Sequence, residues 1–401
     1  MNDMKQKNID TLAHWRKTVA MALAGAIALS ASFMATAQSI MPRAPEVAGS
    51  SYILIDANTG HVIMEQNSDE SLPPASLTKI MTAYIAEVEI DNGNLSLDDM
   101  VFISERAWRT QGSKTFVDVN SYVRVEDLLR GIIIQSGNDA SVAMAEHIAG
   151  SEEAFADLMN QHARALGMTN SYFINSSGLD AGAETNLMSA RDLATLSRVK
   201  IMEHPSHYAM YSEREFTFNG ITQSNRNTLL FRDRTVDGIK TGWTTPAGYC
   251  LVASAERDGM RLISVVMGTA SEEARVVETQ KMLSYGFRFF ETHKLYDAGE
   301  AVSSARVWSG KENSVELGIP EDVLITIPRG RAGDLTATVE MDGDIQGGFE
   351  AGQVMGRVQV SLEDEVLYSG DVVALTGVER GGLLKRLIDA LTLFIMGLLG
   401  R

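Results

Sequence analysis

Strand-like segments at both ends of a long helical region constrain the fold of this chain more than any other feature. The segments Ser51–Asp56 and Val62–Glu65 flank Asn58-Thr59-Gly60, a combination that predicts a two-stranded hairpin. Three more strand-like segments follow the helical region, at residues 236–243, 248–255 and 262–268. Short connections, including Asp258-Gly259, predict that these three form an antiparallel meander. We therefore expect one α/β domain whose sheet takes strands from both ends of this part of the sequence.

The N-terminus has the pattern of a secretory signal peptide. Arg16-Lys17 precedes an apolar segment at residues 19–34, and Ala35-Thr36-Ala37 supplies the small residues of a cleavage site. We expect residues 1–37 to be removed, so that Gln38 begins the exported chain. A retained membrane anchor is the alternative, which the short apolar segment fits less well.

Composition excludes several classes of function. The net charge of −17 is opposite to the basic surface that nucleic-acid binding requires. The seven histidines show no spacing typical of a metal site, so we expect no metal and no other cofactor. The single cysteine, Cys250, rules out an intrachain disulfide, and it lies in an apolar run that predicts a buried strand thiol. Export without disulfides suggests a bacterial periplasm or cell surface.

The composition changes after about Leu295. Short β-type runs separated by Gly and Asp turns predict a small all-β domain at residues 298–378, after a larger domain at 38–297.

Residues 379–401 change character again and carry an apolar helical stripe. The stripe consists of Leu384, Leu387, Ile388, Leu391, Phe394, Ile395 and Leu398. The apolar run is shorter than the ~20 residues that a spanning helix needs. We therefore expect an amphipathic helix lying on a membrane surface. A helix docked on the β domain or at an oligomer seam is the alternative.

A turn with two prolines leads into a helical pattern that begins at Ser76. Lys79 follows three residues later, so the two side chains lie on one face of the helix start. A hydroxyl beside an amine at such a position can become an activated nucleophile. Burial, together with the charge of a second lysine, Lys240, would lower the pKa of Lys79 and let it act as a base.

Two further motifs give this pair a chemical context. Ser136-Gly137-Asn138 falls in a loop between helical patterns, and Lys240-Thr241-Gly242 falls on a predicted strand. Each motif alone is common. The three in this order are close to the set found in class A β-lactamases and penicillin-binding proteins, which catalyse acyl transfer.

Acyl transfer needs a nucleophile, a proton shuttle, a carboxylate clamp and an oxyanion hole. Ser76 is the candidate nucleophile, and neutral Lys79 is the group expected to take its proton. Ser136, held by Lys240, is expected to pass that proton to the leaving amine.

Binding of the substrate backbone falls to other residues of the same motifs. Asn138 is expected to bind the backbone amide of the substrate. The backbone N–H groups of Ser76 and Trp243 are candidates for the oxyanion hole. Gly242 would leave room for the substrate strand.

Together the motifs resemble those of the low-molecular-mass penicillin-binding protein 5 type, the D-alanyl-D-alanine carboxypeptidases of the serine β-lactamase and penicillin-binding protein superfamily. The likeness includes residues 129–131, 135–140, 237–242, 285–292 and 325–331. The resemblance implies an antiparallel sheet with helices on both faces. It also implies a periplasmic enzyme, peripherally attached to the outer face of the inner membrane, that trims the terminal D-Ala from peptidoglycan pentapeptides. Covalent acylation by β-lactam antibiotics is implied as well.

Alignment with that family places its carboxylate-binding arginine at Arg275, where it would act with Thr241. A forked guanidinium suits a free carboxylate, and a surface ion pair on the helix is the alternative. Two positions depart from the family. Trp243 stands where His is frequent, which leaves the deacylation rate open, and Ser177 replaces a usual His or Pro and is assigned no role.

Two other functions fit the same motifs. One is a β-lactamase or DD-endopeptidase on this scaffold, although no Glu-x-x-Leu-Asn segment is present to supply a deacylating glutamate. The other is a non-catalytic cell-wall-binding protein with a vestigial site.

Overall fold

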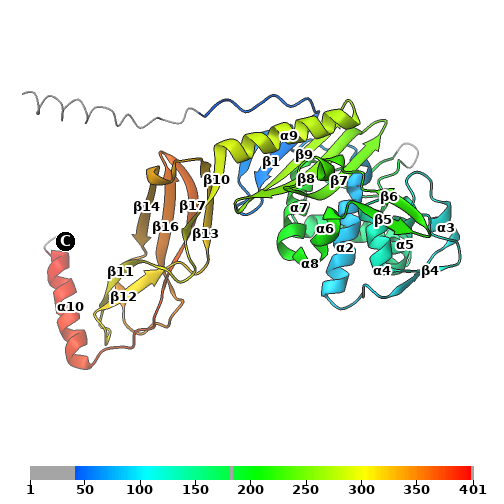
Figure 1. Cartoon of the computed structure of the whole chain (residues 1–401). Helices are drawn as coiled ribbons and strands as arrows, with labels where there is room; N and C mark the ends of the chain where they lie inside the picture. The colour runs from blue at the N-terminus through cyan, green and yellow to red at the C-terminus, as the bar shows by residue number, and fades with distance from the viewer. Residues whose placement is uncertain (1–40, 181–183, 399–401) are drawn as a thin grey trace, which may run out of the picture. The chain divides into compact units, whose positions relative to one another are not determined.

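The computed structural model describes residues 41–180 and 184–398 (Figure 1). The expected signal peptide at residues 1–37 lies outside the described residues.

A five-stranded antiparallel sheet forms the centre of the first domain. Its strands are β1 (Ser51–Asp56), β2 (Val62–Gln66), β7 (Val236–Thr244), β8 (Gly248–Arg257) and β9 (Met260–Thr269). Their order is β2-β1-β9-β8-β7, so the sheet takes strands from both sides of the helical region, as predicted. At the β8–β9 turn, Asp258 and Gly259 have φ values of 51° and 81°. Left-handed values of this kind fit a tight hairpin.

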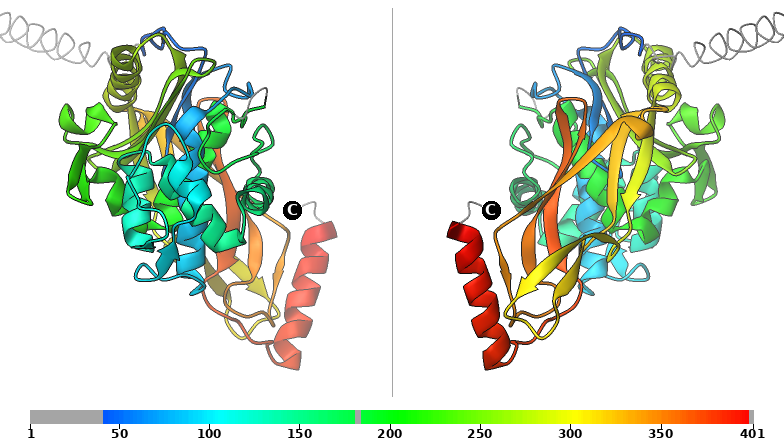
Figure 2. Two further views of the ribbon diagram at one scale, coloured as in Figure 1. Left: turned by 90° about the vertical axis from the view of Figure 1, so that its right-hand side faces the viewer. Right: turned by 90° about the vertical axis from the view of Figure 1, so that its left-hand side faces the viewer.

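Helices cover both faces of this sheet. Ile53 and Ile55 of β1 pack into the core shared with the helical insertion, while Tyr52 and Leu54 pack into the core beneath the long helix α9 (Glu272–Phe289). Successive strand residues point to opposite faces, so one apolar strand serves both cores. Figures 1 and 2 show α9 on one side of the sheet and the helices of the insertion on the other. The predicted fold class is confirmed.

The elements of this domain, apart from the sheet, follow in chain order. They are η1 (Ala75–Thr78), α2 (Lys79–Asp91), β3 (Met100–Phe102), α3 (Glu105–Arg109), β4 (Tyr122–Arg124), α4 (Val125–Ile133), α5 (Asn138–Ala149), α6 (Glu152–Ala165), α7 (Ala190–Glu203), α8 (Pro205–Tyr208), η2 (Ala209–Ser212), β5 (Glu215–Phe218), β6 (Ile221–Ser224), η3 (Thr228–Phe231) and α9 (Glu272–Phe289). Four of these helices, α3, α6, α7 and α9, start after a serine whose hydroxyl accepts a hydrogen bond from the first helical turn: Ser104, Ser151, Ser189 and Ser271.

The second domain is built almost entirely of strands around its own apolar core. Strands β10 (Phe290–Tyr296) and β13 (Val323–Pro328) form an antiparallel pair. A six-stranded sheet has the order β14-β16-β17-β12-β11-β15. Its strands are β11 (Ala301–Trp308), β12 (Ser314–Gly318), β14 (Leu335–Met341), β15 (Ile345–Gln346), β16 (Val354–Leu362) and β17 (Glu365–Ala374), and a short turn, η4 (Ala332–Asp334), precedes β14.

The last helix, α10 (Leu383–Leu398), contacts strand β11 through its polar side. The Asp389 carboxylate is buried and accepts a hydrogen bond from the backbone N–H of Ser309 at 2.8 Å, and Lys385 bonds the Asn313 side chain. The large apolar side chains of α10 are exposed, with Leu384 at 73% and Phe394 at 66%. The helix is therefore docked on the β-rich domain while its apolar stripe faces outward. Among the described residues, no helix is both long and apolar enough to cross a membrane.

Candidate active site

Ser76 lies in a tight turn that leads directly into α2. The predicted helix start is a 3₁₀ turn, η1, and the α-helix begins only at Lys79. Ala75 has a left-handed φ of 48°, which lets the chain turn sharply after two prolines. The Ser76 side chain is half-buried, and Lys79 Nζ lies 3.1 Å from Ser76 Oγ. The hydroxyl of Ser76 and the amine of Lys79 are therefore in contact, as the sequence predicts.

Lys79 is buried with three hydrogen-bond acceptors around its amine. Besides Ser76 Oγ, Nζ contacts Asn138 Oδ1 at 2.7 Å and the backbone carbonyl of Ser177 at 2.6 Å. Burial lowers the pKa of Lys79 to about 7, with help from the positive charge of Arg226. Carboxylates at Asp139 and Glu152 act in the opposite direction.

Lys240, on strand β7, is the second buried amine of the site. Burial lowers its pKa well below the ordinary value, and repulsion from Lys79, Arg226 and Arg275 lowers it further. Its Nζ donates to the carbonyl of Thr241 at 3.1 Å. The expected repulsion between Lys79 and Lys240 is present, and the guanidinium of Arg226 adds a second positive charge that acts on both amines.

Ser136 occupies a strained position between α4 and α5. Its φ is 61°, it is 2% exposed, and its Oγ has no hydrogen-bond partner among the described residues. Non-glycine residues in this region cluster at functional sites, where surrounding structure holds them. Here the backbone that follows Ser136 is held by hydrogen bonds from the Gly137 N–H to the carbonyl of Gly131 at 2.9 Å and from the Asn138 N–H to the carbonyl of Ser113 at 2.7 Å.

Asn138 connects the loop at residues 111–113 to the reactive pair. Its Nδ2 donates to the carbonyl of Gln111 at 2.7 Å, and its backbone N–H donates to the carbonyl of Ser113. Since Oδ1 accepts from Lys79, the oxygen and the nitrogen of the amide each make one hydrogen bond within the protein, and each can make a second.

Gly242 allows strand β7 to pack closely against the Ser76 turn. A Cβ at this position would lie 2.7 Å from the carbonyl oxygen of Pro74. The structure thus adds a reason for glycine here besides room for a substrate. The next residue, Trp243, is 54% exposed, and its ring lies 5.8 Å from that of Tyr249.

Arg275 lies in the first turn of α9 and is only 5% exposed. One guanidinium nitrogen donates to the carbonyl of Gly242 at 3.3 Å, and the group lies over the ring of Tyr249. Its Nε is buried without a partner among the described residues. The exposed Glu272 carboxylate lies 3.5 Å from a guanidinium nitrogen, so the ion pair considered above is also present.

Two cavities meet at Ser76. The first, of about 390 Å³, is lined by Ser76, Ser136, Arg226, Thr241, Gly242, Trp243, Tyr249 and Arg275, among others. The second, of about 480 Å³, is lined by Ser76, Asn138, Gly178, Leu179, Asp180 and Trp243, among others. A ligand lying across Ser76 therefore reaches both cavities, and Arg226 lines each of them.

Sequence reasoning missed several groups of this site. The Ser177 carbonyl holds Lys79, although Ser177 was assigned no role; any residue has a carbonyl, so no residue type signals this contact. Arg226 lies in the polar run Asn225-Arg226-Asn227, which matches no motif. Cys250 is buried as predicted, and burial raises its pKa to about 11. No cluster of metal-ligand type occurs within residues 41–180 and 184–398.

Comparison with known proteins places this site in a family. Residues 38–271 match the family described as D-alanyl-D-alanine carboxypeptidase, and residues 290–380 match the penicillin-binding protein 5 C-terminal domain. The chain is 42% identical over 364 residues to the D-alanyl-D-alanine carboxypeptidase DacA of Escherichia coli (strain K12), which covers 89% of this chain and 90% of that protein.

Solved structures agree with this assignment. Penicillin-binding protein 5 from Haemophilus influenzae aligns with a TM-score of 0.79 at 42% identity, over 84% of this chain and 100% of that one. Penicillin-binding protein D2 from Listeria monocytogenes, in its ampicillin-bound form, aligns with a TM-score of 0.57 at 30% identity, over 61% of this chain and 100% of that one. The chain belongs to the serine-type D-alanyl-D-alanine carboxypeptidases of the penicillin-binding protein 5 type.

Proposed function

We propose that Ser76 is the nucleophile of this carboxypeptidase and that neutral Lys79 takes its proton. The observation that carries the proposal is the 3.1 Å contact between Lys79 Nζ and Ser76 Oγ, made by a buried amine whose pKa is about 7. At pH 7 about half of such amines are neutral, whereas an amine with a pKa of about 10.4 is neutral in fewer than about one molecule in 1,000. The buried lysine is therefore a base at working pH.

Arg275 and Thr241 bind the terminal carboxylate of a peptide ending in D-Ala-D-Ala. Both line the first cavity, and the buried Nε of Arg275 is left without a protein partner among the described residues. Asn138, which lines the second cavity, binds the backbone amide on the acyl side of the scissile bond. The substrate then lies across Ser76.

The reaction follows from these positions. Ser76 Oγ bonds to the carbonyl carbon of the penultimate D-Ala, and the N–H groups of Ser76 and Trp243 stabilise the oxyanion. As the peptide C–N bond breaks, the proton taken by Lys79 passes through Ser136 to the leaving D-Ala amine. The expected hydrogen bond from Lys240 to Ser136 is not formed in the structure, where Lys240 Nζ donates to the carbonyl of Thr241. Water then hydrolyses the ester, which restores the Ser76 hydroxyl and releases a peptide shortened by one residue.

The ampicillin-bound relative supports the same acylation by β-lactams, which place a strained amide at the nucleophile. Fluorescent penicillin is expected to label the wild type and a Ser212→Ala control, whose exposed hydroxyl bonds only a local carbonyl. Ser76→Ala is expected to remain unlabelled. Equal labelling of Ser76→Ala would show that another residue is the nucleophile. Rapid loss of the label, with release of hydrolysed penicillin, would instead identify a β-lactamase.

We further propose that residues 1–37 direct export to the periplasm and that α10 attaches the protein to the outer face of the inner membrane. The docked polar side and exposed apolar stripe of α10 support a helix lying on that surface. Deleting residues 383–401 is expected to move the protein from the membrane to the soluble fraction. Replacing Leu387 and Leu391 by Ser should weaken attachment without removing the helix. A deletion variant that stays with the membrane would refute the anchor.

A further inference from the structure

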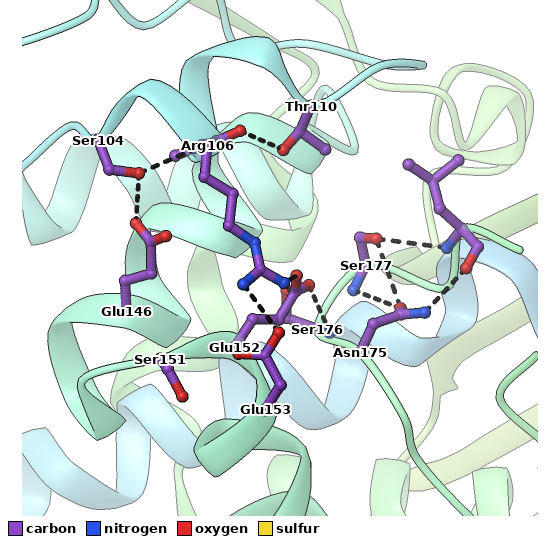
Figure 3. Close-up of polar contacts among 12 residues, drawn as sticks. Ser104, Arg106, Thr110, Glu146, Ser151, Glu152, Glu153, Asn175, Ser176 and Ser177 are labelled. Atoms are coloured by element: carbon purple, nitrogen blue, oxygen red, sulfur yellow. Dashed lines mark hydrogen bonds and ion pairs between the residues drawn. The ribbon is translucent and has the colours of Figure 1, made fainter. Parts of the chain in front are cut away.

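A chain of polar contacts leads from the amine of Lys79, through the segment at Ser176 and Ser177, to the buried carboxylate of Glu152. Figure 3 shows the part of this chain from Ser176 to Glu152. Lys79 Nζ donates to the backbone carbonyl of Ser177 at 2.6 Å. Together with Asn138 Oδ1 at 2.7 Å, this carbonyl fixes where Nζ lies relative to Ser76. Whatever holds the loop at Ser177 therefore also holds the base.

The preceding residue, Ser176, fastens this loop to the protein interior. It is completely buried, and its carbonyl accepts a hydrogen bond from Thr82 Oγ1, on α2, at 2.6 Å. Its backbone N–H and its Oγ both donate to one oxygen of Glu152, Oε1, at 3.1 Å and 2.7 Å. All polar groups of Ser176 are thus paired, and Glu152 accepts from two of them.

Glu152 is the first residue of α6 and is 8% exposed. A buried carboxylate is costly unless it is paired. Its second oxygen, Oε2, accepts from the Arg106 guanidinium at 2.8 Å, and another nitrogen of the same group binds Glu153 at 2.8 Å. Figure 3 shows the three side chains converging, with only Glu152 continuing to Ser176.

We propose that Glu152 is a positioning residue for acylation: through Ser176 it fixes the Ser177 carbonyl, and through that carbonyl it fixes Lys79 Nζ against Ser76. The proposal rests on the proposed roles of Ser76 and Lys79. Glu152 itself touches neither the substrate cavities nor the reacting atoms.

The charge of Glu152 gives this role a signature that a purely structural residue lacks. Four charged groups face Lys79 from different elements: Asp139 from α5, Glu152 from α6, Arg226 from the segment before η3, and Lys240 from β7. Glu152 is negative and favours the protonated amine, so its pKa effect on Lys79 is upward. Neutralising Glu152 should therefore make the free base available at lower pH.

The acylation rate of the full chain by a fluorescent penicillin, measured from pH 5.5 to 10, tests this proposal. In Glu152→Gln the amide oxygen still accepts from Ser176, and the midpoint of the rising limb should move to lower pH. Glu152→Ala leaves the Ser176 donors unpaired. Its plateau rate should fall by about 10- to 100-fold, since a displacement of ~1 Å at a reacting group costs on the order of 100-fold.

Glu153→Gln is the matched control, because Glu153 shares Arg106 but makes no contact with Ser176. Its pH profile and plateau should equal those of the wild type, and thermal unfolding should verify that each variant is folded. Coincident profiles for Glu152→Gln and Glu153→Gln, or a folded Glu152→Ala with wild-type rates, would overturn the positioning role. A wild type that is not labelled would overturn the proposed nucleophile instead.

Discussion

Lys79 is surrounded by groups whose effects on its pKa have opposite signs. Burial has the largest effect and favours the neutral amine, and Arg226 acts in the same direction. Asp139 and Glu152 favour the protonated form, so they limit the fall of the pKa. The outcome, a pKa of about 7, lies near the pH at which a general base works best.

This balance predicts the pH dependence of acylation. Because the folded pKa is lowered, the active neutral form of Lys79 exists above about pH 7 and is lost as the pH falls below it. The acylation rate by penicillin should therefore rise with pH around a midpoint near 7. Lys79→Arg, which stays charged, should be inactive over the whole range. A rising limb found only above pH 9 would contradict the role of Lys79.

Arg275 provides a second residue-scale prediction, about substrate recognition. A hydrogen bond to a charged group contributes about 1.5–3 kcal/mol, so Arg275→Gln should lower kcat/KM by about 10- to 100-fold. The loss should appear for a peptide ending in a free D-Ala carboxylate. The corresponding C-terminal amide, compared in wild type and variant, should lose little. An equal loss on both peptides would show that Arg275 acts through structure alone.

At this scale the residue types indicate which side chains meet, whereas they give no signal for contacts made by the backbone. The type and spacing of Ser76 and Lys79 indicated a reactive pair, and the structure places them in contact. The carbonyl of Ser177 carries no signal in the residue type. The charge of Arg226 reaches the site through the fold, since Arg226 lies outside all three motifs in the sequence.

At the scale of elements, the Ser76 turn is held between strand β7 and the loop at residues 175–178. Gly242 permits the close approach on one side and Gly178 on the other. Gly178 has a φ of 77°, and a Cβ there would lie 1.9 Å from the carbonyl oxygen of Ala75. At both positions the atom nearest to an added Cβ is a backbone carbonyl oxygen, which cannot move aside as a flexible side chain would.

Gly178→Ala is therefore expected to displace the loop that carries Ser177. Acylation should slow by at least about tenfold, and the free energy of unfolding should fall by about 1–3 kcal/mol from backbone strain. Gly167→Ala is the matched control, since Gly167 has a φ of 71° but no atoms within 4 Å of the added Cβ. It should lose stability while keeping the wild-type acylation rate. Similar acylation by the two variants would show that the packing of this turn is unimportant.

Elements with a strong local signal were predicted, and those fixed by tertiary contacts were not. Serine caps mark the starts of α6, α7 and α9. The start of α2 was placed too early, because the apolar spacing does not distinguish a 3₁₀ turn from an α-helix. Helix α9 ends at Phe289 and β10 begins at Phe290, with no glycine or proline between them to mark the change. Strand β10 pairs with β13, although it lies before residue 297, the expected end of the first domain.

At the scale of the whole molecule, sheet topology explains how motifs far apart in sequence form one site. Strand β7, which carries Lys240, is an edge strand of the five-stranded sheet, and it packs against the turn of Ser76. The helical insertion then brings Ser136 and Asn138 to the same place. The order of the three motifs in the sequence predicts that they take part in one reaction. The distances between their side chains depend on how β7 and the helical insertion pack against the Ser76 turn.

The release of D-Ala from a pentapeptide ending in D-Ala-D-Ala tests the central claim most directly. Wild type, Ser76→Ala and penicillin-treated wild type should be compared at equal concentrations of folded protein. The wild type should release one D-Ala per peptide, and both the variant and the treated enzyme should release none above background. Undiminished release by Ser76→Ala, or no release by the wild type, would contradict the assignment of Ser76 as the nucleophile of a D-alanyl-D-alanine carboxypeptidase.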